Sequence, residues 1–569
     1  MDKKSQGIIR KYAIKNAIDY GKASVGSVLG KSLSMMPDAK SRINEIKAEV
    51  ERVINEVNAL PKDRLAAEYK KHQEEFAEEY KEKVEQTSKP KMVLEGAVEG
   101  KFAIRYAPAP SGYMHIGHTK AAFLATEFAK IYKGKVFLYF DDTNPEKDRK
   151  EYVDAIKKDL KWLGLKFDDE YYSSDGMEAF YGYARQLIDA DAAYVCMCSA
   201  EAIKKDRFVG RECKHRGHSK KENAKLFSDM VANKYDEGQA ILRFKGSMDS
   251  QNTALRDPTL MRIKKDKHYR QGTKYVVWPN YDMSTPINDS VHGITDAVRT
   301  KEYELRDELD AMILDALKLR KPRIHSDSRL VIKNNITHKR ELNELISKKI
   351  ITGWDDPRLV TLAALKKRGI QPAAIKEFAL RFGMSKTDSV VDIEMLLAEN
   401  KKILDPVAKH LFYVENPVKL MLDADEEIDV AIKVHPSKDM GERAYKITDT
   451  VYISGADTKD LKAGEVIRLK DLFNIEITKA GKPIKAKMTD VKGSKSIQWV
   501  PETYIECSVL VPENPLDDNG KFIKSSIKTS RGYVEGFADD IEEKEVVQFE
   551  RFGFCILHDK KNMQFIFSS

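Results

Sequence analysis

The sequence has few cysteines and no long apolar run. Five cysteines in 569 residues are too few for a disulfide framework and favour a reducing compartment. No apolar segment approaches the roughly 20 residues of a membrane-spanning helix, and the chain begins with charge at Met1-Asp-Lys-Lys, with no apolar core after it. A disulfide-stabilised secreted protein and a membrane protein are therefore disfavoured. We expect a cytoplasmic protein with no membrane contact, and a monomer by default.

The excess of one sign of charge is also small. The chain has 98 Lys and Arg residues against 90 Asp and Glu residues, a net charge of +8. This balance does not by itself indicate a polyanionic partner, because Lys-rich runs also occur as solvated faces. A nucleic acid would have to bind localised basic surfaces set among acidic ones.

The periodicity of apolar residues divides the chain into regions. Residues 1–95 are predicted to be helical, because apolar positions recur at three- and four-residue steps, as between Ile43 and Val57. In residues 96–195 strands and helices alternate, which predicts the first half of a parallel, doubly wound, Rossmann-like sheet. A Cys- and Lys-rich insertion at 196–270 interrupts that pattern.

The remaining regions complete a predicted multidomain α/β protein. Sheet-like sequence returns at Lys274-Tyr-Val-Val-Trp, so residues 271–335 are expected to hold the second half of the doubly wound domain. Residues 336–408 are predicted to be helical again. In residues 409–569 apolar and polar residues alternate between turns, which predicts one or two antiparallel β-barrels.

One segment combines the features of a nucleotide site. A predicted strand ends at the Pro-punctuated turn that contains Pro108, Pro110 and Gly112, and an apolar helix follows. A helix N-terminus offers unpaired amide donors and a partial positive charge to phosphate. We therefore expect ATP to bind at this turn.

Two histidines flank the predicted helix start. His115 and His118 are spaced so that both imidazoles point into one small volume, and Gly117 lets a flat base lie against the backbone. An isolated His-x-x-His pair usually means two surface histidines. After a strand and a Pro-x-Pro-Ser-Gly turn, it instead favours a nucleotide site.

Charged residues lie at the ends of the two predicted strands around this turn. Arg105 ends the first strand and Asp141 the second, and in a parallel sheet such ends face the ligand crevice. Taken alone, each would usually be a surface charge.

The insertion contains a possible metal-binding pattern. Cys196 and Cys198 are followed by Cys213 and His215, and three thiols with one imidazole suit tetrahedral zinc. Such a zinc would be structural, because all four ligands come from the protein. The alternative is three reduced cysteines and a solvated histidine. Cys507 and Cys555 lie in alternating apolar runs and are predicted to be core residues.

Residues 103–146 closely resemble the catalytic core of the glutamyl- and glutaminyl-tRNA synthetases of class I, whose nucleotide signature reads His-Ile-Gly-His. Two further segments support the resemblance. Tyr12-Ala-Ile-Lys-Asn-Ala-Ile-Asp-Tyr-Gly-Lys-Ala looks like the N-terminal region of archaeal glutamyl enzymes, and Gly353-Trp-Asp-Asp-Pro-Arg-Leu is similar to the segment after the second signature. The resemblance implies that the insertion holds the acceptor end of tRNA and that the barrels read the anticodon. Some relatives carry a similar Cys-x-Cys and Cys-x-His site.

The resemblance also implies an amino-acid pocket formed by Arg105, Asp141, Tyr281 and Arg299. Two arginines suit a substrate with two carboxylates, which favours L-glutamate. The segment that begins at Phe140 is spelled as in glutaminyl enzymes, so a glutaminyl-tRNA synthetase is the nearest alternative. The archaeal-type N-terminus favours glutamate. Thr285 and Asn288 lie near the expected pocket without an assigned role.

The second signature of the family is spelled unusually. Met384-Ser-Lys386 matches it literally but follows the Gly353 segment, whereas the family places this loop before that segment. The better match is Ile336-Thr-His-Lys-Arg-Glu-Leu, in which only Lys339 and Arg340 are retained and His338 replaces a serine. The chemistry needs a mobile ammonium that neutralises charge on the leaving pyrophosphate, and Lys339 supplies it.

The activity implied is glutamate–tRNA ligase. ATP, with Mg²⁺ shared between its phosphates, would activate glutamate at His115, His118 and Lys339, and the glutamyl group would pass to tRNA-Glu. Whether tRNA-Gln is also charged stays open, as does the role of the N-terminal helices. A non-catalytic relative that keeps the fold for tRNA binding is the alternative of another class, because of the altered Ile336–Arg340 loop. A shorter tRNA-modifying paralogue would lack the predicted barrels.

Overall fold

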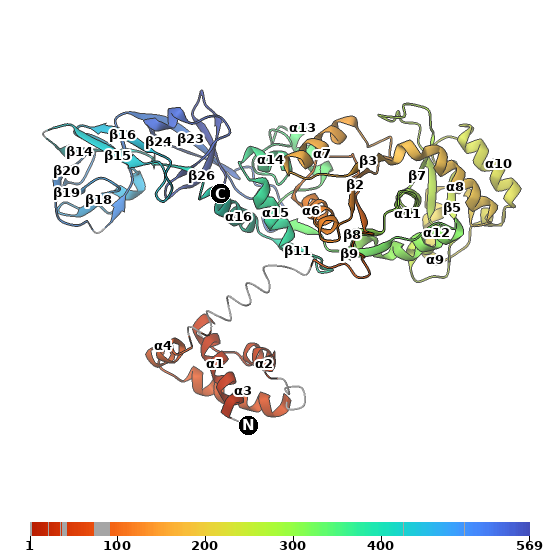
Figure 1. Ribbon diagram of the computed structural model, residues 1–569, viewed down its shortest axis with the longest axis horizontal. Helices are drawn as coiled ribbons and strands as arrows, with labels where there is room; N and C mark the ends of the chain where they lie inside the picture. Colours follow the sequence, from red (N-terminus) through yellow and green to blue (C-terminus); the bar gives the residue numbers. More distant parts are fainter. Residues whose placement is uncertain are drawn as a thin grey trace. The chain divides into compact units, whose positions relative to one another are not determined.

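The computed structural model describes residues 3–20, 22–34, 36, 43–72, 75, 92–424, 426–493 and 495–569. The chain forms two separately packed units, Met1–Pro90 and Lys91–Ser569 (Figure 1). The part of the predicted N-terminal helical region at 76–91 lies outside the described residues. None of the described helices is both long and apolar enough to cross a membrane.

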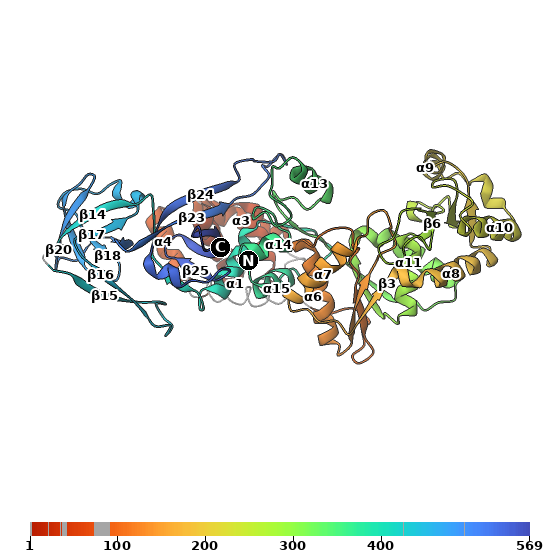
Figure 2. The same cartoon turned by 90° about the horizontal axis from the view of Figure 1, so that it is seen from above.

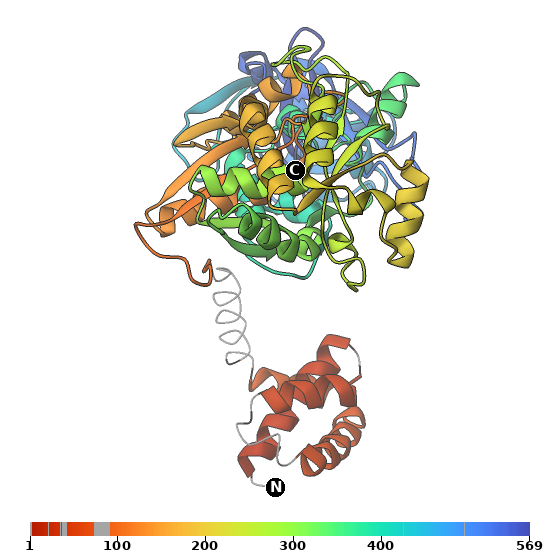
Figure 3. The same ribbon diagram turned by 90° about the vertical axis from the view of Figure 1, so that its right-hand side faces the viewer.

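The first unit is a small helical domain with its own core (Figure 3). Its described helices are α1 (Lys3–Tyr20), α2 (Val25–Ser34), α3 (Ile43–Asn58) and α4 (Lys62–Lys70). In α3, apolar residues at three- and four-residue steps form one buried stripe, which packs against Ile9, Ala13 and Ile14 of α1. The helices predicted here are confirmed.

A parallel sheet carries the nucleotide segment in the second unit. Strands β1 (Ala103–Tyr106), β2 (Lys135–Phe140) and β3 (Asp169–Tyr172) pair in parallel, as do β8 (Asp296–Thr300) and β9 (Arg323–Asp327). The Thr295 N–H donates to the Ala103 carbonyl at 2.9 Å and places β8 beside β1. The resulting order β3-β2-β1-β8-β9 is that of the predicted doubly wound domain.

Helices cover this sheet because their apolar residues recur on one face. Helix α6 (Ile116–Ile131) packs on β1 and β2. Helix α7 (Lys150–Trp162), which Figure 2 shows in the same region as α6 and β3, buries Val153, Ile156 and Leu160. Two further helices of this domain are α11 (Tyr281–Val291) and α12 (Asp307–Ala316), and the 3₁₀ helix η5 (Lys301–Arg306) precedes α12. The C-terminal ends of β1 and β2 therefore meet the N-terminus of α6.

The inserted domain is built on an antiparallel sheet of β4 (Ala193–Cys196), β5 (Ile241–Phe244), β6 (Thr259–Ile263) and β7 (Val277–Pro279). This sheet extends beyond the predicted insertion at 196–270. The prediction missed β4 and β7 because their apolar runs are not distinguishable in sequence from parallel strands. Its helices are α8 (Met177–Asp189), α9 (Ala200–Val209) and α10 (Lys220–Val231).

The helical region after the sheet contains α13 (Lys339–Ser347), α14 (Leu362–Lys367), α15 (Pro372–Leu380) and α16 (Glu394–Leu404). It is not wholly helical as predicted. Strand β11 (Ser389–Val391) pairs in parallel with β10 (Leu330–Ile332) and ties this region back to the sheet domain.

The C-terminal part forms two seven-stranded, barrel-like sheets. Their orders are β21-β18-β19-β20-β14-β17-β22 and β12-β25-β26-β27-β23-β24-β13, and a hairpin of β15 and β16 accompanies them. Most pairs are antiparallel as predicted, but four are parallel: β12 with β25, β14 with β20, β18 with β21, and β23 with β27. The bounds are β12 (Lys409–Leu411), β13 (Tyr413–Glu415), β14 (Val418–Asp423), β15 (Ile428–Lys433), β16 (Glu442–Ile447), β17 (Thr450–Ile453), β18 (Val466–Leu469), β19 (Asn474–Lys479), β20 (Ile484–Thr489), β21 (Ser496–Ile497), β22 (Trp499–Pro501), β23 (Tyr504–Pro512), β24 (Ile527–Glu535), β25 (Val546–Phe549), β26 (Gly553–Asp559) and β27 (Gln564–Phe567).

Candidate active site

The two histidines of the nucleotide segment cap the start of α6. His115 is the N-cap residue, and its Nδ1 accepts from the Gly117 N–H at 3.1 Å. The Nδ1 of His118 accepts from the His115 N–H at 3.0 Å, and the two ring centroids lie 3.9 Å apart. Because both Nδ1 atoms accept, each neutral ring carries its proton on Nε2 and offers that N–H as a donor.

Both imidazoles are held in the neutral form. Burial, with the nearby His118 and His338, lowers the pKa of His115 to about 2. Surrounding protein lowers the pKa of His118 to about 4, although part of that ring is open to solvent. The site therefore presents two neutral donors, rather than two imidazolium charges, beside a helix N-terminus at neutral pH.

Gly117 is required by the cap itself. A Cβ built on this residue would lie 2.9 Å from His115 Cε1 and 3.0 Å from the Leu330 carbonyl oxygen. Any larger residue would displace the His115 ring or the β10 backbone. A glycine at position 117 is therefore needed for the cap, and it also leaves free the space that we expected the nucleotide base to occupy.

Lys339 contacts the nucleotide segment although it is distant from that segment in the sequence. It is the first residue of α13, and its Nζ donates to the Ser111 carbonyl oxygen and lies 4.4 Å from the centroid of the Tyr152 ring. The Lys339 Cδ also approaches Gly112. The two predicted halves of the ATP site are thus brought together.

Lys386 is engaged elsewhere. Its side chain is 65% exposed and forms an ion pair with Glu304 of η5. The preceding Ser385 N–H donates to Asp327, which also holds the buried Lys120 Nζ at 2.9 Å. The segment Met384–Lys386 thus packs against the end of β9, and the contacts of Lys386 differ from those of Lys339.

The two predicted pocket arginines already carry internal carboxylates. Arg105 donates to both carboxylate oxygens of Asp289, at 2.9 and 3.1 Å, and to the Val298 carbonyl. Burial opposes its charge, but Asp289 keeps the pKa of Arg105 above its ordinary value. Arg299 pairs with Asp307 at 2.6 Å and with Asp310 at 2.7 Å.

These carboxylates reduce the positive charge that Arg105 and Arg299 offer to a substrate. The Tyr281 hydroxyl lies 3.4 Å from Arg299 Nη1, and burial raises the pKa of Tyr281 to about 12, so it is a neutral hydrogen-bonding group. Burial raises the pKa of Asp310 to about 7 despite Arg299. Arg105 and Arg299 are therefore fixed and partly neutralised before any substrate binds.

Asp141 and Tyr281 line one pocket of about 360 Å³. Ala109 and Ser111 form another part of its wall, so this pocket adjoins the nucleotide segment. Burial raises the pKa of Asp141, although Arg105 and Arg262 oppose that shift, and its Oδ1 is buried with no hydrogen-bond partner among the described residues. An ammonium group would satisfy this oxygen.

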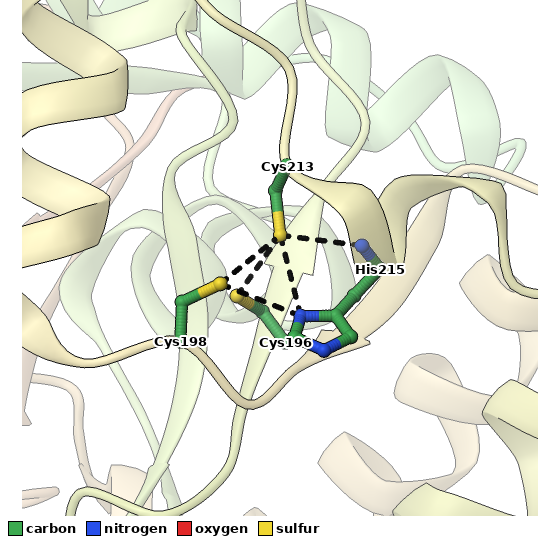
Figure 4. Close-up of side chains that lie close together, drawn as sticks. All are labelled: Cys196, Cys198, Cys213 and His215. Atoms are coloured by element: carbon green, nitrogen blue, oxygen red, sulfur yellow. Dashed lines mark hydrogen bonds between the residues drawn. The ribbon is translucent and has the colours of Figure 1, made fainter.

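The four predicted metal ligands converge at the end of β4 (Figure 4). Sγ of Cys196, Cys198 and Cys213 and Nδ1 of His215 all lie within 4.8 Å of one another. Contacts of 3.4 to 3.5 Å join Cys213 to the other three. Zinc with bonds of about 2.3 Å to sulfur and about 2.0 Å to nitrogen would give tetrahedral edges of roughly 3.6 to 3.8 Å. The donor types and separations fit zinc.

Helix α11 contributes polar residues to the site, of which Asp289 was not predicted from the sequence. Its residues from Asp282 to Ser290 are all buried, and most of them are polar. Asp289 holds Arg105, and Asn288 donates to Ser173 Oγ at 3.3 Å; Thr285 is buried without a role that we can assign. A helix with so many polar residues at buried positions is itself a signal of a site. Arg262 of β6 also lines the Asp141 pocket and was not predicted.

Comparison with known proteins agrees with this arrangement. Residues 101–406 match the model of the tRNA synthetases class I (E and Q) catalytic domain. Residues 408–494 and 496–558 match two models of the anti-codon binding domain of the same group.

Curated relatives are similar over nearly the whole chain. The glutamate–tRNA ligase of Nitrosopumilus maritimus is 39% identical over 563 residues, covering 98% of this chain and 98% of that protein. The glutamate–tRNA ligase of Pyrococcus furiosus is 37% identical over 574 residues, with 97% of each chain covered. A catalytic-domain match over more than half of the sequence, together with these relatives, shows that the chain belongs to the class I tRNA synthetases of the glutamate and glutamine family.

Proposed function

We propose that this protein is a glutamate–tRNA ligase. It activates L-glutamate with ATP, bound as its Mg²⁺ complex, to glutamyl-adenylate, and transfers the glutamyl group to the 3′ end of tRNA-Glu with release of AMP. The similarity to glutamate–tRNA ligases over nearly the full chain carries this proposal. The contact between Lys339 and Ser111 supports it further, because the contact brings together the two segments that we propose to bind ATP.

In the first step an oxygen of the glutamate α-carboxylate attacks the α-phosphorus of ATP. A carboxyl–phosphorus bond forms, the bond from the α-phosphorus to the bridging oxygen breaks, and pyrophosphate leaves. The Nε2–H groups of His115 and His118 donate to phosphate oxygens, and the Lys339 ammonium neutralises the charge that develops on pyrophosphate. Positioning and charge stabilisation suffice, and no covalent enzyme intermediate is needed.

In the proposed amino-acid pocket, different residues bind the α-ammonium and the side chain of glutamate. Asp141 accepts from the α-ammonium with its unpartnered Oδ1. Arg105, Arg299 and Tyr281 orient the glutamate side chain from the opposite side, with their geometry fixed by Asp289, Asp307 and Asp310. This assignment of the side-chain carboxylate favours glutamate over glutamine.

In the second step a ribose hydroxyl at the tRNA 3′ end attacks the activated carbonyl and AMP leaves. The Asp141 pocket shares Asn280, Asp282 and Arg306 with a neighbouring pocket of about 390 Å³. That pocket shares Arg207, Thr253 and Thr259 with a larger, mostly apolar pocket of about 810 Å³ along α9. This sequence of pockets supports entry of the tRNA end from the inserted domain, while the barrels bind the anticodon.

We also propose that Cys196, Cys198, Cys213 and His215 hold a structural Zn²⁺. The four donors come from the end of β4, the start of α9 and the 3₁₀ helix η3 (Lys214–Gly217). A bound zinc would supply cross-links between these three elements and no chemistry to the reaction. We also propose a reducing, cytoplasmic location, because five cysteines in 569 residues are too few for a disulfide framework. A monomer remains our proposal for the assembly.

The direct test is aminoacylation of separate tRNA-Glu and tRNA-Gln transcripts with glutamate and with glutamine. We expect glutamate to be attached to tRNA-Glu in an ATP-dependent reaction. Attachment of glutamine instead would make the protein a glutaminyl-tRNA synthetase. If neither amino acid is attached and no ATP–pyrophosphate exchange occurs with tRNA present, the chain is a non-catalytic relative. Glutamate on tRNA-Gln would define a dual specificity.

A further inference from the structure

The Asp141 pocket contains an arginine that differs from all its arginine neighbours. Arg105 is bound by Asp289, Arg299 by Asp307 and Asp310, and Arg306 by Asp282. Arg262 lines the same pocket, and no carboxylate of the described chain lies within ion-pair distance of it. Lys147 also lines this pocket without an ion pair among the described residues, but it is exposed to solvent, whereas Arg262 is half-buried. Arg262 is therefore the half-buried cation of this pocket that lacks a carboxylate partner.

The contacts of Arg262 involve one side of its guanidinium group. Nη1 donates to the Pro279 carbonyl at 3.1 Å and to the side-chain oxygen of Asn280, which are both neutral. Within the described chain Nε and Nη2 donate to no protein group, and neither atom is sealed from solvent. Two donors in a fixed fork are therefore available to an oxyanion.

Nearby groups show where such an oxyanion would lie. Burial lowers the pKa of Arg262, while Asp141, Asp148 and Glu146 act at a distance to keep it charged. Asp141 is the proposed partner of the substrate α-ammonium. In an α-amino acid the group next to the ammonium is the α-carboxylate, which becomes the acyl phosphate of the adenylate. Arg262 lines the Asp141 pocket together with Ser111 of the nucleotide segment, whereas Arg105 does not line it. Arg262 thus faces the reacting end of the substrate, not its side chain.

We propose that Arg262 binds the oxyanion at the reacting end of the substrate, which is the α-carboxylate of glutamate before activation or the phosphate of the adenylate after it. The proposal rests on the function proposed above and adds a substrate-binding residue that the sequence motifs do not contain. When the substrate binds, its oxyanion replaces solvent at the Arg262 guanidinium and accepts charge-assisted hydrogen bonds from it. The contacts with Pro279 and Asn280 hold the plane of the guanidinium in the pocket.

Direct binding separates the two sources of the oxyanion. L-Glutamate carries the carboxylate, and the non-reactive analogue glutamol-AMP carries the phosphate without a carbonyl. In Arg262→Gln we expect at least one of the two dissociation constants to rise by about 10- to 100-fold. A rise for glutamate alone assigns the carboxylate, and a rise for the analogue assigns the phosphate. Arg262→Lys keeps the charge without the fork and should lie between the wild type and Arg262→Gln.

Arg256→Gln is the matched control. Arg256 is also half-buried and, like Arg262, donates only to neutral groups, which here are the backbone carbonyls of Ser250, Arg207 and Phe208. It does not line this pocket. Both dissociation constants should stay within about twofold of the wild type in that variant. Unchanged binding of both ligands to a folded Arg262→Gln, shown by an unaltered unfolding temperature, would overturn the proposal. If the wild type charges neither amino acid, the proposed function fails instead.

Discussion

The Nζ of Lys339 donates to the backbone carbonyl of Ser111, and these two residues are 228 positions apart in the chain. The bond joins the first turn of α13 to the Pro-punctuated turn after β1. It holds the ammonium next to the segment where the phosphates are expected, through a backbone acceptor that substitution of Ser111 would not remove. When ATP binds, its phosphates can replace this carbonyl as the partner of the ammonium.

Replacing Lys339 by alanine should mainly slow the activation of glutamate. The ammonium acts on charge that develops as pyrophosphate leaves, so we expect the turnover of ATP–pyrophosphate exchange to fall by about 10²- to 10³-fold. The KM for glutamate should change little, because the lysine donates to the Ser111 backbone and to none of the side chains proposed to bind glutamate. Steady-state exchange kinetics with tRNA present measure both quantities.

Lys386→Ala is the control for this variant. It removes an ammonium from the segment that literally matches the family signature, but that ammonium is exposed and pairs with Glu304. We expect exchange within about twofold of the wild type, because solvent screens an exposed ion pair and this one lies away from the nucleotide segment. A larger loss in Lys386→Ala than in Lys339→Ala would show that the assignment of the second signature is wrong.

The two capping histidines should make the fold sensitive to acid. Their pKa values in the folded protein are about 2 for His115 and about 4 for His118, against about 6.5 in an unfolded chain. The unfolded state therefore binds protons more readily. The stability from neutral His115 and His118 is fully present above pH 6.5 and is lost as the pH falls toward 4 and then 2. The apparent unfolding temperature should drop between pH 7.5 and 5.5.

His115→Asn isolates this effect, because asparagine also caps helices. The variant should lose less stability than the wild type over the same pH interval. His558→Asn removes an exposed histidine of β26 and should leave the pH dependence unchanged. If His115→Asn and the wild type respond equally to acid, His115 is not held neutral by the fold.

The sequence was sufficient to predict the elements whose signals are local. Helix α6 (Ile116–Ile131) is the apolar helix predicted after the Pro-punctuated turn, and it was predictable because its capping residues and its apolar stripe are contiguous. The place of Lys339 at the nucleotide site was implied only by the family resemblance, and its contact with Ser111 was not predicted, since no local pattern specifies a contact over that separation. Convergence of the four Cys and His side chains followed from their short spacing.

Long-range contacts explain what the sequence did not predict. Asp289 and Asp310 look like ordinary polar residues of amphipathic helices until the fold brings them to Arg105 and Arg299. The extent of the inserted sheet was missed because β4 and β7 bury both faces and show no alternation. Strand β11 was missed because its three residues are too few for a periodicity signal.

Substitution of a zinc ligand should lower metal content without removing the adenylate site. We expect about one zinc per wild-type chain purified without a His-tag, and a strongly reduced content in His215→Asn. His218→Asn is the matched control, because that ring lies 5.1 Å from His215 but is not among the four donors. Elemental analysis and the unfolding temperature report both effects. Wild-type protein with less than about 0.2 zinc per chain would rule out the site.

Phe208 should contact the unpaired 3′ nucleotides of tRNA. Its ring is 82% exposed at the end of α9, beside the apolar pocket that leads toward Asp141. Arg256 donates to the carbonyls of Arg207 and Phe208, each at 2.9 Å, so this exposed aromatic residue is held in place. No ion pair of the described chain includes Arg207, which leaves a cation for phosphate. An exposed aromatic next to cations is a platform on which bases stack.

Removing the Phe208 ring should therefore weaken tRNA use and spare glutamate activation. Base–aromatic stacking contributes about 1 to 3 kcal/mol per base, so kcat/KM for tRNA should fall by roughly 5- to 100-fold in Phe208→Ala. Phe208→Trp should retain activity, and Val407→Ala, which trims another exposed apolar residue, should have no effect. Affinity for a tRNA without its unpaired 3′ nucleotides should be the same for Phe208→Ala and the wild type. An equal loss for intact and truncated tRNA would place the contact of Phe208 elsewhere on the tRNA, because truncation removes only the bases that the ring is expected to stack on.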